Sequence, residues 1–302
     1  MIDITSKIST YRKASAQAIV EVSKKETIDA VKNKTVPKGD VFEMAKTAGL
    51  FAVKKTSDII PDCHPIPIEQ TSIEYKIQDL QIIITLNAAT IYKTGIEVEA
   101  MHGASVVALT IYDMLKPIDK EIKIKQIKLL NKKGGKADFT DKLMGEVSAS
   151  VIVCSDSISK GKKEDKAGLA ICDKLKSVNV SVKNYEIIPD EKETIHAKTK
   201  KHAADKVDLI LICGGTGLSK RDVSPEAVSP LIEREIPGIM EAARNYGQQR
   251  MPYAMLSRGV AGMRGNSLII TLPGSTRGAI ETMDALFPYV LHIFHVAKGA
   301  QH

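Results

Sequence analysis

Beyond residue 146 the chain alternates apolar runs with amphipathic stretches, and this alternation restricts its fold more than any other feature. We predict strands at VSASVIVCSD, SVKNYEIIPD and VDLILICGG, with helices between them at AGLAICDKLKSV and ETIHAKTKKHAADK. A later strand at SLIITLPGS and a final helix from about Thr276 continue the pattern. Such alternation predicts an α/β unit with a mostly parallel sheet, right-handed crossovers and flanking helices.

The first half follows a different pattern. We expect a helix around residues 10–33, a second helix capped by Asp40 and two strands around a turn at Asp79. A long helix that ends at Pro117 and a last strand at EIKIKQIKLLN complete this half. Helices and antiparallel strands in this order predict an α+β sandwich with an antiparallel, ferredoxin-like sheet.

The polar segment 131–146, rich in Gly and Lys, separates the two patterns. We therefore expect two domains joined by a linker. The first covers residues 1–140, the linker residues 141–147 and the second residues 148–302.

Composition restricts the class of protein. The chain has 43% hydrophobic and 26% charged residues, no apolar run long enough to span a bilayer and no signal peptide, so we expect a cytoplasmic protein without membrane contact. Its net charge of +7 is spread out and its aromatic content is only 4%, which favours small anionic substrates over nucleic acid. The four cysteines form no CxxC pair and predict free thiols. Arginines are uneven, because Arg12 is the only one before Arg221 and seven follow from there.

Asp113 is the most unusual residue of the first half, because it interrupts VVALTIYDMLK, a stretch apolar enough to be buried. A buried carboxylate needs a partner or a chemical role. Lys116 shares its helix face, and Glu99, fourteen residues earlier, lies about 40° off that face. This stripe of acid, base and acid suits proton transfer, but an ion pair that ties the helix to its neighbour is an alternative interpretation.

Three shorter motifs also have two interpretations each. His64 in PDCHP is a proton carrier or a structural turn residue. Lys38 in PKGDV shares an anion with a helix N-terminus, or Asp40 alone caps that helix. Lys136 in KKGGKADF contacts a ligand from a mobile glycine loop, or belongs to a plain linker.

Taken together, several stretches of the first half resemble one family, the cyclic pyranopterin monophosphate synthases (MoaC) of molybdenum cofactor biosynthesis. They are MIDIT, KGDVFEMAKTAG, AVKKTSDIIPDCHP, KTGIEVEAMHGASVVALTIYDMLK and LLNKKGGKADF. The resemblance covers nearly all of residues 1–140. It implies conversion of 3′,8-cyclo-7,8-dihydro-GTP to cyclic pyranopterin monophosphate, with release of pyrophosphate.

This resemblance also implies roles for individual residues. Catalysis falls to Asp113 and Lys116, with support from His64, Lys38 and Glu97. Ammonium groups suit a reaction that releases pyrophosphate, and proton donors and acceptors suit the ring rearrangement. Val98 stands where the family has Met, and Ala137-Asp138 where it has Ser-Gly, but neither change removes a reacting group. The implied substrate contacts are Asp62, Cys63, His64, Val98, Glu99 and, toward the phosphates, Lys136.

In the second half, the strand VDLILICGG enters a Gly-Gly-Thr-Gly loop. Glycines let backbone N–H groups approach a phosphate or a polar ring edge, although a bare tight turn is equally consistent with them. The loop matches neither G-x-G-x-x-G nor G-x-x-x-x-G-K-[ST], so the dinucleotide and P-loop interpretations both fail on spacing.

Asp190 and Asp222 follow two of the predicted parallel strands, at the sheet edge where open α/β folds bind ligands. Two carboxylates beside a phosphate site predict a Mg²⁺ pair, unless one or both cap the following helix. Ser155 and Asp156 end the first strand in the same way. TLPGSTRGA adds a Gly-Ser turn with Arg277 at a helix start, a candidate phosphate clamp.

A second resemblance connects these motifs. SVIVCSDSISKGKKEDKAG, IIPDE, ICGGTGLSKRDVSPEA and AMLSRGVAGMRGNSLIITLPGSTRGA are similar to the molybdopterin adenylyltransferases (MogA/MoaB), over about residues 147–302. The resemblance implies a molybdopterin-binding fold that adenylylates molybdopterin with Mg-ATP, and it assigns catalytic, metal-associated roles to Asp190 and Asp222. The usual Pro-Lys is Thr276-Arg277 here, which keeps the cation. The implied ligand site comprises Ser155, Asp156, Asp165, Gly214, Gly215, Thr216, Gly217, Pro273, Gly274, Ser275 and Arg277.

The leading hypothesis is thus a bifunctional cofactor-synthesis enzyme whose substrates are the cyclic dihydro-GTP derivative, molybdopterin and ATP. An alternative is a pyranopterin synthase fused to a non-catalytic molybdopterin-binding scaffold, which the presence of both Asp190 and Asp222 disfavours. A third, a dinucleotide-dependent oxidoreductase, is weakened by the missing glycine motif. We expect no tightly bound cofactor besides Mg²⁺ with ATP. The resemblances imply hexamers with sites at subunit interfaces for the first half and trimers for the second, so we expect a homo-oligomer with three-fold symmetry.

Overall fold

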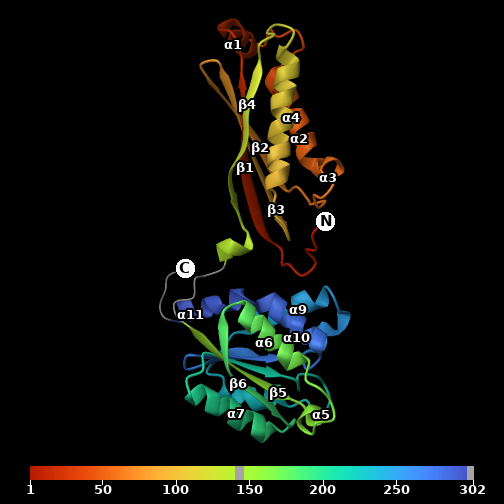
Figure 1. Cartoon of the computed structure of the whole chain (residues 1–302), viewed down its shortest axis with the longest axis vertical. Helices are drawn as coiled ribbons and strands as arrows, with labels where there is room; N and C mark the ends of the chain where they lie inside the picture. The colour runs from red at the N-terminus through yellow and green to blue at the C-terminus, as the bar shows by residue number, and fades with distance from the viewer. Residues whose placement is uncertain (140–145, 298–302) are drawn as a thin grey trace. The chain divides into compact units, whose positions relative to one another are not determined.

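The computed structural model describes residues 1–139 and 146–297. The chain divides into two compact units, Met1–Phe139 and Thr140–His302, and each is described by itself (Figure 1). Most of the predicted linker, 141–147, lies outside the described residues.

The N-terminal unit contains one four-stranded sheet. Its strands are β1 (Thr10–Glu21), β2 (Gln70–Gln78), β3 (Gln81–Tyr92) and β4 (Lys123–Lys133). They lie in the order β2-β3-β1-β4, and all neighbours are antiparallel. The predicted antiparallel sheet is therefore confirmed.

Four helices accompany this sheet: α1 (Lys25–Lys32), α2 (Val41–Lys54), α3 (Thr56–Ile59) and α4 (Glu97–Leu115). The predicted cap of α2 is confirmed, because Asp40 accepts hydrogen bonds from the amides of the next turn. Helices α2 and α4 approach closely at Gly49 and Gly103, where a Cβ atom would lie 2.4 Å and 2.5 Å from valine side chains of the facing helix. This close packing against α2 holds α4 in place, and α4 carries several of the predicted site residues.

The helix expected around residues 10–33 is wrong for its first half, which is strand β1. Ala14, Ala16, Ala18 and Val20 are fully buried, whereas Gln17 and Ile19 between them are only partly buried. This period of two is that of a strand, but alanine is the best helix former, and its intrinsic propensity concealed the alternation. Only the end of the expected helix exists, as α1.

The C-terminal unit contains a six-stranded sheet in the order β6-β5-β7-β10-β9-β8. The first four strands are mutually parallel, and β9 and β8 add an antiparallel edge. The prediction of a mostly parallel sheet is thus confirmed, while the two edge strands were not predicted. The strands are β5 (Val147–Cys154), β6 (Val180–Ile188), β7 (Leu209–Cys213), β8 (Arg234–Glu235), β9 (Ala261–Arg264) and β10 (Ser267–Leu272).

Helices cover both faces of this sheet, as predicted. Helices α6, α9 and α10 pack together on one face, and α7 with α8 on the other (Figure 1). The helices are α5 (Asp156–Ser159), α6 (Ala167–Ser177), α7 (Lys192–Ala204), α8 (Ser224–Val228), α9 (Pro237–Gln248), α10 (Thr276–Leu286) and α11 (Ile293–Val296). Because β5, β7 and β10 are parallel neighbours, the loops that follow them emerge at the same edge of the sheet.

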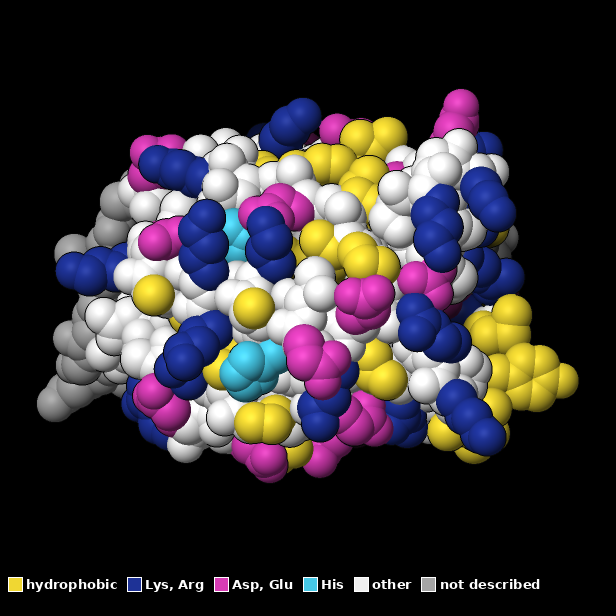
Figure 2. All heavy atoms as spheres, turned by 90° about the horizontal axis from the view of Figure 1, so that it is seen from below, with side chains coloured by type: hydrophobic (Ala, Val, Ile, Leu, Met, Phe, Trp, Pro, Cys, Tyr) yellow, Lys and Arg dark blue, Asp and Glu magenta, His cyan; other side chains and the backbone are white. Residues whose placement is uncertain are grey.

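Two surface properties bear on function. Among the described residues, no helix is long and apolar enough to cross a membrane. Figure 2 shows the face of the C-terminal unit that lies at the bottom of Figure 1, where lysines and arginines are interspersed with acidic side chains. This mixture on the visible face differs from the continuous basic surface typical of nucleic-acid binding.

Candidate active sites

The first cluster of predicted residues, which we call the Asp113 group, comprises Lys38, Asp113 and Lys116. The Nζ of Lys38 donates to the Asp113 carboxylate at 2.7 Å and to its main-chain oxygen at 2.9 Å. Lys116 Nζ lies 2.7 Å from the other carboxylate oxygen. Hydrogen bonds from Lys116 and then Lys38 lower the pKa of Asp113 to about 2. The group therefore presents two ammonium groups held by one permanently ionised carboxylate.

The expectation that Asp113 is buried is wrong, because its side chain is 51% exposed. It lies near the C-terminal end of α4, where its neighbours Met114 and Leu115 turn toward the core instead. The ion pair with Lys38 does tie α4 to the segment before α2, as the alternative interpretation held. An exposed ion pair adds little stability, so its contribution to the fold does not by itself explain a carboxylate at this position.

The second cluster, which we call the Glu99 group, comprises Cys63, Glu97 and Glu99. It lies at the start of α4. Glu99 is only 2% exposed, and one of its carboxylate oxygens has no hydrogen-bond partner among the described residues. Cys63 donates its thiol hydrogen to the other oxygen at 3.2 Å. Burial raises the pKa of Glu99 and, together with the adjacent Glu99 carboxylate, raises that of the Cys63 thiol to about 12. Next to them, Glu97 pairs with Lys132 of β4 at 2.9 Å.

The two clusters lie at opposite ends of one helix. Fourteen residues separate Glu99 from Asp113, which corresponds to about 21 Å at the α-helical rise of 1.5 Å per residue. The predicted stripe of Asp113, Lys116 and Glu99 therefore does not form one site within a single chain. The sequence suggested Asp113 as the buried carboxylate of α4, but the buried one in the structure is Glu99.

Three other predicted residues, His64, Asp62 and Val98, are direct chain neighbours of Cys63 or Glu99. His64 donates from Nε2 to the main-chain oxygen of Ile2 at 2.8 Å, so its ring is held by the N-terminal segment. Asp62 pairs with the terminal amine at 2.7 Å. Val98 is exposed on the first turn of α4. The side chain of Lys136 lies outside the described residues.

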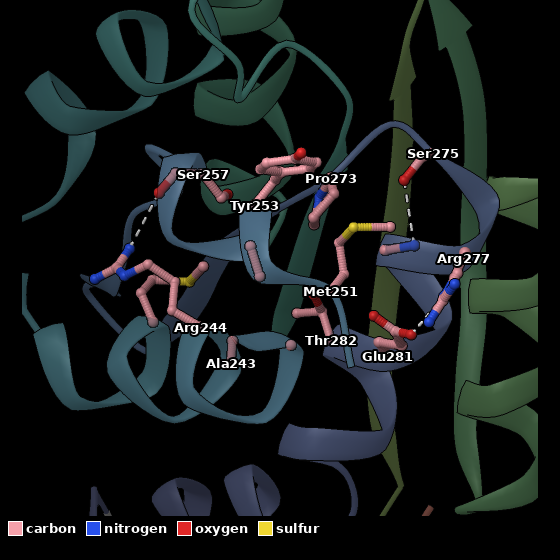
Figure 3. A pocket seen from close by; sticks show the side chains of 14 residues that line it. Ala243, Arg244, Met251, Tyr253, Ser257, Pro273, Ser275, Arg277, Glu281 and Thr282 are labelled. Carbon is pink, nitrogen blue, oxygen red and sulfur yellow. Dashed lines mark hydrogen bonds and ion pairs between the residues drawn. The ribbon is translucent and has the colours of Figure 1, made fainter. Parts of the chain in front are cut away.

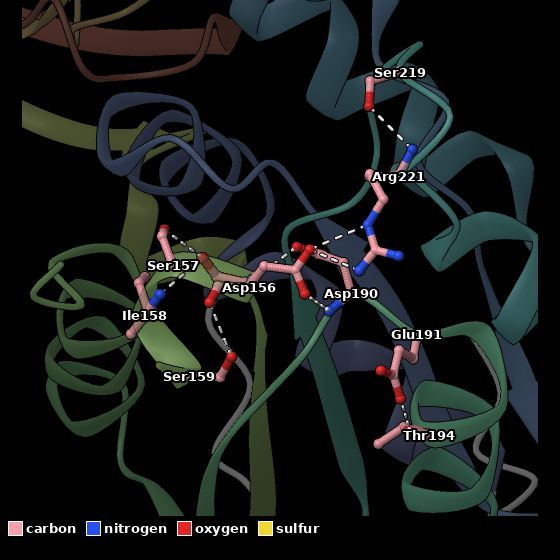
Figure 4. A network of polar contacts seen from close by, with 10 residues as sticks. Asp156, Ser157, Ile158, Ser159, Asp190, Glu191, Thr194, Ser219 and Arg221 are labelled. Carbon is pink, nitrogen blue, oxygen red and sulfur yellow. Dashed lines mark hydrogen bonds and ion pairs between the residues drawn. The ribbon is translucent and has the colours of Figure 1, made fainter. Parts of the chain in front are cut away.

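In the C-terminal unit, Asp156 and Asp190 face each other across the ends of β5 and β6 (Figure 4). Each carboxylate accepts a hydrogen bond from the other residue's amide, at 3.1 Å and 3.3 Å. Arg221 reaches Asp156 with two nitrogens, at 3.1 Å and 2.6 Å. Burial raises the pKa of Asp190, and the negative charges of Asp156 and Asp222 add to this effect. The site thus concentrates carboxylates and compensates one of them with a guanidinium group.

Neither Asp190 nor Asp222 caps a helix, so the alternative interpretation of these carboxylates as helix caps is wrong. The N-cap of α7 is Glu191 and that of α8 is Val223, and neither helix has a side-chain cap. Asp222 instead accepts the amide of Ser219 at 2.8 Å and closes the turn in its own loop. Among the described residues no three His, Cys, Asp or Glu side chains form a metal cluster. Two carboxylates nevertheless suit Mg²⁺, which takes its other ligands from phosphate and water.

The glycine loop after β7 is tightly built. Gly214 has a φ of +111°, and a Cβ atom there would lie 2.3 Å from the Cys154 carbonyl oxygen. Gly215 has a φ of +64°, which also disfavours a side chain. Gly274 of the loop after β10 contacts Gly214, because its Cβ position is 3.1 Å from the Gly214 Cα. The two predicted ligand loops are therefore in contact.

Pro273, Ser275 and Arg277 line a cavity of about 220 Å³ beside this contact (Figure 3). Ser275 caps α10 by accepting the Gly278 amide at 3.2 Å. Arg277 forms an ion pair with Glu281, in which Nε lies 2.7 Å from the carboxylate oxygen Oε1. Helix α9 and the segment after it contribute an apolar part of the lining, which includes Met240, Ala243, Met251, Tyr253 and Ala254. The polar side chains of Arg244, Glu281 and Thr282 also line the cavity.

Two further predicted residues have internal partners. Ser155 caps the short helix α5 by accepting the Ile158 amide. Asp165 is buried and accepts hydrogen bonds from the Gly168 amide, at 2.9 Å, and from the Tyr185 hydroxyl. Asp165 therefore supports the packing of α6 against β6 in this structure.

Among the described residues, the basic side chains of Lys132, Arg221 and Arg258 contact predicted site residues, although sequence reasoning assigned them no role. Arg258 hydrogen-bonds to main-chain oxygens of Gly217 and Asp222. The concentration of arginines from Arg221 onward was the available signal. Lys132 belongs to a lysine-rich strand and carried no comparable signal.

Comparison with known proteins follows this division of the chain. Residues 1–135 match the model of the MoaC family, and residues 150–292 match a model described as a probable molybdopterin binding domain. A molybdenum cofactor biosynthesis bifunctional protein of Chlorobaculum tepidum is 37% identical over 302 residues, covering 100% of this chain and 96% of the relative. The chain belongs to this family of bifunctional molybdenum cofactor biosynthesis proteins.

Other relatives agree with this membership. A bifunctional protein of the same description from Synechococcus elongatus is 35% identical, covering 100% of this chain and 98% of the relative. A cyclic pyranopterin monophosphate synthase of Clostridium perfringens is 44% identical over 139 residues, which is 45% of this chain and 87% of the relative. Among solved structures, the molybdopterin biosynthesis enzyme MoaB of Thermus thermophilus is 40% identical over 51% of this chain and 98% of its own, with a TM-score of 0.49.

Family membership confirms the predicted function of the chain as a bifunctional enzyme of molybdenum cofactor biosynthesis, with a MoaC domain followed by a MogA/MoaB-type domain. A fusion to a non-catalytic scaffold is not favoured.

Proposed function

We propose that the N-terminal unit converts 3′,8-cyclo-7,8-dihydro-GTP to cyclic pyranopterin monophosphate, and that the C-terminal unit adenylylates molybdopterin with Mg-ATP. Both reactions release pyrophosphate. The observation that carries the proposal is that each matched family region holds its own cluster of charged groups, the Asp113 group in one and the paired carboxylates Asp156 and Asp190 in the other.

In the N-terminal reaction, Lys38 and Lys116 bind the triphosphate and stabilise the charge of the leaving pyrophosphate. Asp113 holds both ammonium groups in position and stays ionised, as its low pKa requires. Glu99, whose pKa burial raises, is the better proton donor of the two carboxyl groups. His64, Glu97 and the substrate contacts Asp62, Cys63, Val98 and Lys136 complete this proposed site.

In the C-terminal reaction, the amides of the loop Gly214–Gly217 and the N-terminus of α10 bind phosphate oxygens. Asp190 and Asp222 would hold Mg²⁺, which would neutralise phosphate charge when bound. The cavity beside Pro273, Ser275 and Arg277 lies next to the glycine loop and suits an uncharged ring, because its lining is mostly apolar. Ser155, Asp156, Asp165 and Gly274 complete the proposed lining.

The proposal also includes the fold of the N-terminal unit and the location of the protein. The N-terminal order of one strand, helices, two strands, a helix and a strand, with sheet order β2-β3-β1-β4, supports a ferredoxin-like fold. We also propose a cytoplasmic location with small-molecule partners.

Pyrophosphate release tests the proposed function. The purified chain is given each substrate separately, the cyclic dihydro-GTP derivative or molybdopterin with Mg-ATP, and pyrophosphate is measured. We expect release in both assays. EDTA is expected to stop adenylylation, and added Mg²⁺ to restore it. Absence of release with molybdopterin and Mg-ATP would support a binding scaffold instead.

We further propose a homo-oligomer with three-fold symmetry, in which the Asp113 group of one copy meets the Glu99 group of another. Support comes from the separation of about 21 Å between the two groups along α4, since one small substrate cannot contact both in one chain. A second copy removes this difficulty if it places its Glu99 group beside the Asp113 group of the first.

Mixing of two inactive variants tests this arrangement. Asp113→Ala and Glu99→Ala chains, each inactive alone, are co-expressed and purified as mixed oligomers. Random mixing is expected to restore about a quarter of wild-type pyranopterin formation, because that fraction of shared sites receives both intact groups. A mixture that stays as inactive as the single variants, in oligomers shown to contain both chains, contradicts a shared site.

A further inference from the structure

The loop Thr216–Asp222, which follows the first glycines, has little regular structure of its own. One turn closes it, in which the Asp222 amide donates to the Ser219 oxygen at 2.9 Å and the Ser219 amide donates to the Asp222 carboxylate at 2.8 Å. A loop with so few internal hydrogen bonds does not determine its own shape. The Ser219 amide holds the Asp222 carboxylate within the turn, so groups outside the loop decide where the turn and its carboxylate lie in the site.

Arg258, in the segment between α9 and β9, makes most of these outside contacts. Its amide donates to the Thr216 oxygen at 2.9 Å. Its guanidinium donates from Nε to the main-chain oxygen of Gly217 at 2.7 Å and from Nη2 to the main-chain oxygen of Asp222 at 2.6 Å. One residue thus spans the loop from its first to its last residue, and a planar guanidinium fixes the distance between the two carbonyl groups that it bridges.

Arg258 is itself held from two sides. Its Nη1 pairs with Glu226 of α8, which orients the guanidinium plane. Arg244 of α9 donates to the main-chain oxygens of Ser257 and Gly259, at 3.4 Å each, and so supports the backbone on both sides of Arg258. The loop is therefore connected to α8 and α9 through one side chain.

We propose that Arg258 is a positioning residue for adenylyl transfer, which sets the shape of the loop Thr216–Asp222 and thereby the position of the Asp222 carboxylate. This inference rests on the proposed adenylylation. Among the described residues, the Nε, Nη1 and Nη2 atoms of Arg258 each donate to an oxygen of the protein, which supports an action through the loop.

The test compares Arg258→Ala and Arg258→Lys with Arg234→Ala, whose guanidinium donates to the Gly265 oxygen in the turn between β9 and β10, away from the loop. For Arg258→Ala we expect kcat for adenylylation to fall about 100-fold, because loss of position weakens catalysis more than binding. We expect KM for molybdopterin to change less than threefold. Arg258→Lys, which keeps the charge but not the fork of donors, is expected to recover part of the loss. Arg234→Ala is expected to match the wild type.

Hydrogen exchange on the same full-length proteins provides the second measurement. We expect faster exchange in Arg258→Ala at the amides of Ser219, Arg221 and Asp222, which are hydrogen-bonded within the loop, with exchange of the central strand β7 unchanged. Pyranopterin formation by the same preparations controls for the integrity of the chain.

Each outcome decides the inference. Unchanged turnover, or unchanged loop exchange, in Arg258→Ala overturns it. If that variant does not fold, Glu226→Gln decides, because it removes only the charge that orients the guanidinium, and a wild-type result in both measurements then overturns the inference. If the wild-type chain does not adenylylate molybdopterin, the proposed function fails, and hydrogen exchange still determines whether Arg258 shapes the loop.

Discussion

Replacement of Asp222 by alanine is expected to abolish adenylylation of molybdopterin and to leave pyranopterin formation unchanged. The carboxylate lies at the end of the glycine loop, and its charge adds to the forces that raise the pKa of Asp190. Loss of one of the two carboxylates that we propose hold Mg²⁺ is expected to lower turnover by about 10³-fold. Pyrophosphate release with molybdopterin and Mg-ATP measures this directly.

Because Asp222 also accepts the Ser219 amide, alanine removes a structural hydrogen bond together with the charge. Asp222→Asn separates the two effects, since an amide oxygen still accepts that hydrogen bond. We expect Asp222→Asn to be nearly as inactive as alanine if the charge is what matters. Asp173→Ala is the matched control, because Asp173 is 79% exposed and its ion pair among the described residues is with Lys176 in the same helix, α6. Full activity of Asp222→Asn would contradict a metal-associated role.

Replacement of Asp113 is expected to have the opposite selectivity, with pyranopterin formation lost and adenylylation retained. Asp113→Asn keeps the size of the side chain but removes the charge that holds Lys38 and Lys116. Without it the two ammonium groups repel each other and lose their common position. We expect a fall of about 10³-fold in pyrophosphate release from the cyclic dihydro-GTP derivative, because positioning and charge stabilisation are both affected.

Asp58→Ala is the matched control for this variant. Asp58 forms an exposed pair with Lys55 at the same i, i+3 spacing as the pair between Asp113 and Lys116. We expect it to leave both activities near the wild-type level, since such pairs contribute little to stability. If Asp113→Asn or Asp222→Asn abolished both reactions in a folded chain, the assignment of two separate sites would be wrong.

The sequence predicted most of the elements, and the exceptions have identifiable causes. Strands such as Leu209–Cys213 were recognised because burial on both faces requires a continuous apolar run. Strand β1 was mistaken for a helix because alanine fills its buried face, and intrinsic propensity favoured the wrong period. The edge strands β8 and β9 are short and carry little pattern, so no periodicity could reveal them.

The candidate sites were predicted as sets of residues, not as arrangements. The motifs named Asp113, Lys116 and Lys38, and the structure brings them together. Spacing along a helix also joined Glu99 to them, although Glu99 is buried about four turns away, near the start of α4. Arg258 was not predicted because its partners in the loop are main-chain oxygens. Every residue has a main-chain carbonyl group, so such a contact requires no particular residue type in the sequence.

The sequence by itself determined the family, the order of the two enzyme domains and the identity of the charged residues, because these depend on residue types in a linear order. Only the tertiary structure decided which carboxylate is buried, which loops meet, and which arginine bridges the glycine loop. The physical reason is that burial and hydrogen bonding depend on distances between segments far apart in the chain. Glu99 and Asp113 illustrate this: both are acidic residues of one apolar helix, and packing buries Glu99 and raises its pKa, whereas it leaves Asp113 exposed between two lysines that lower its pKa.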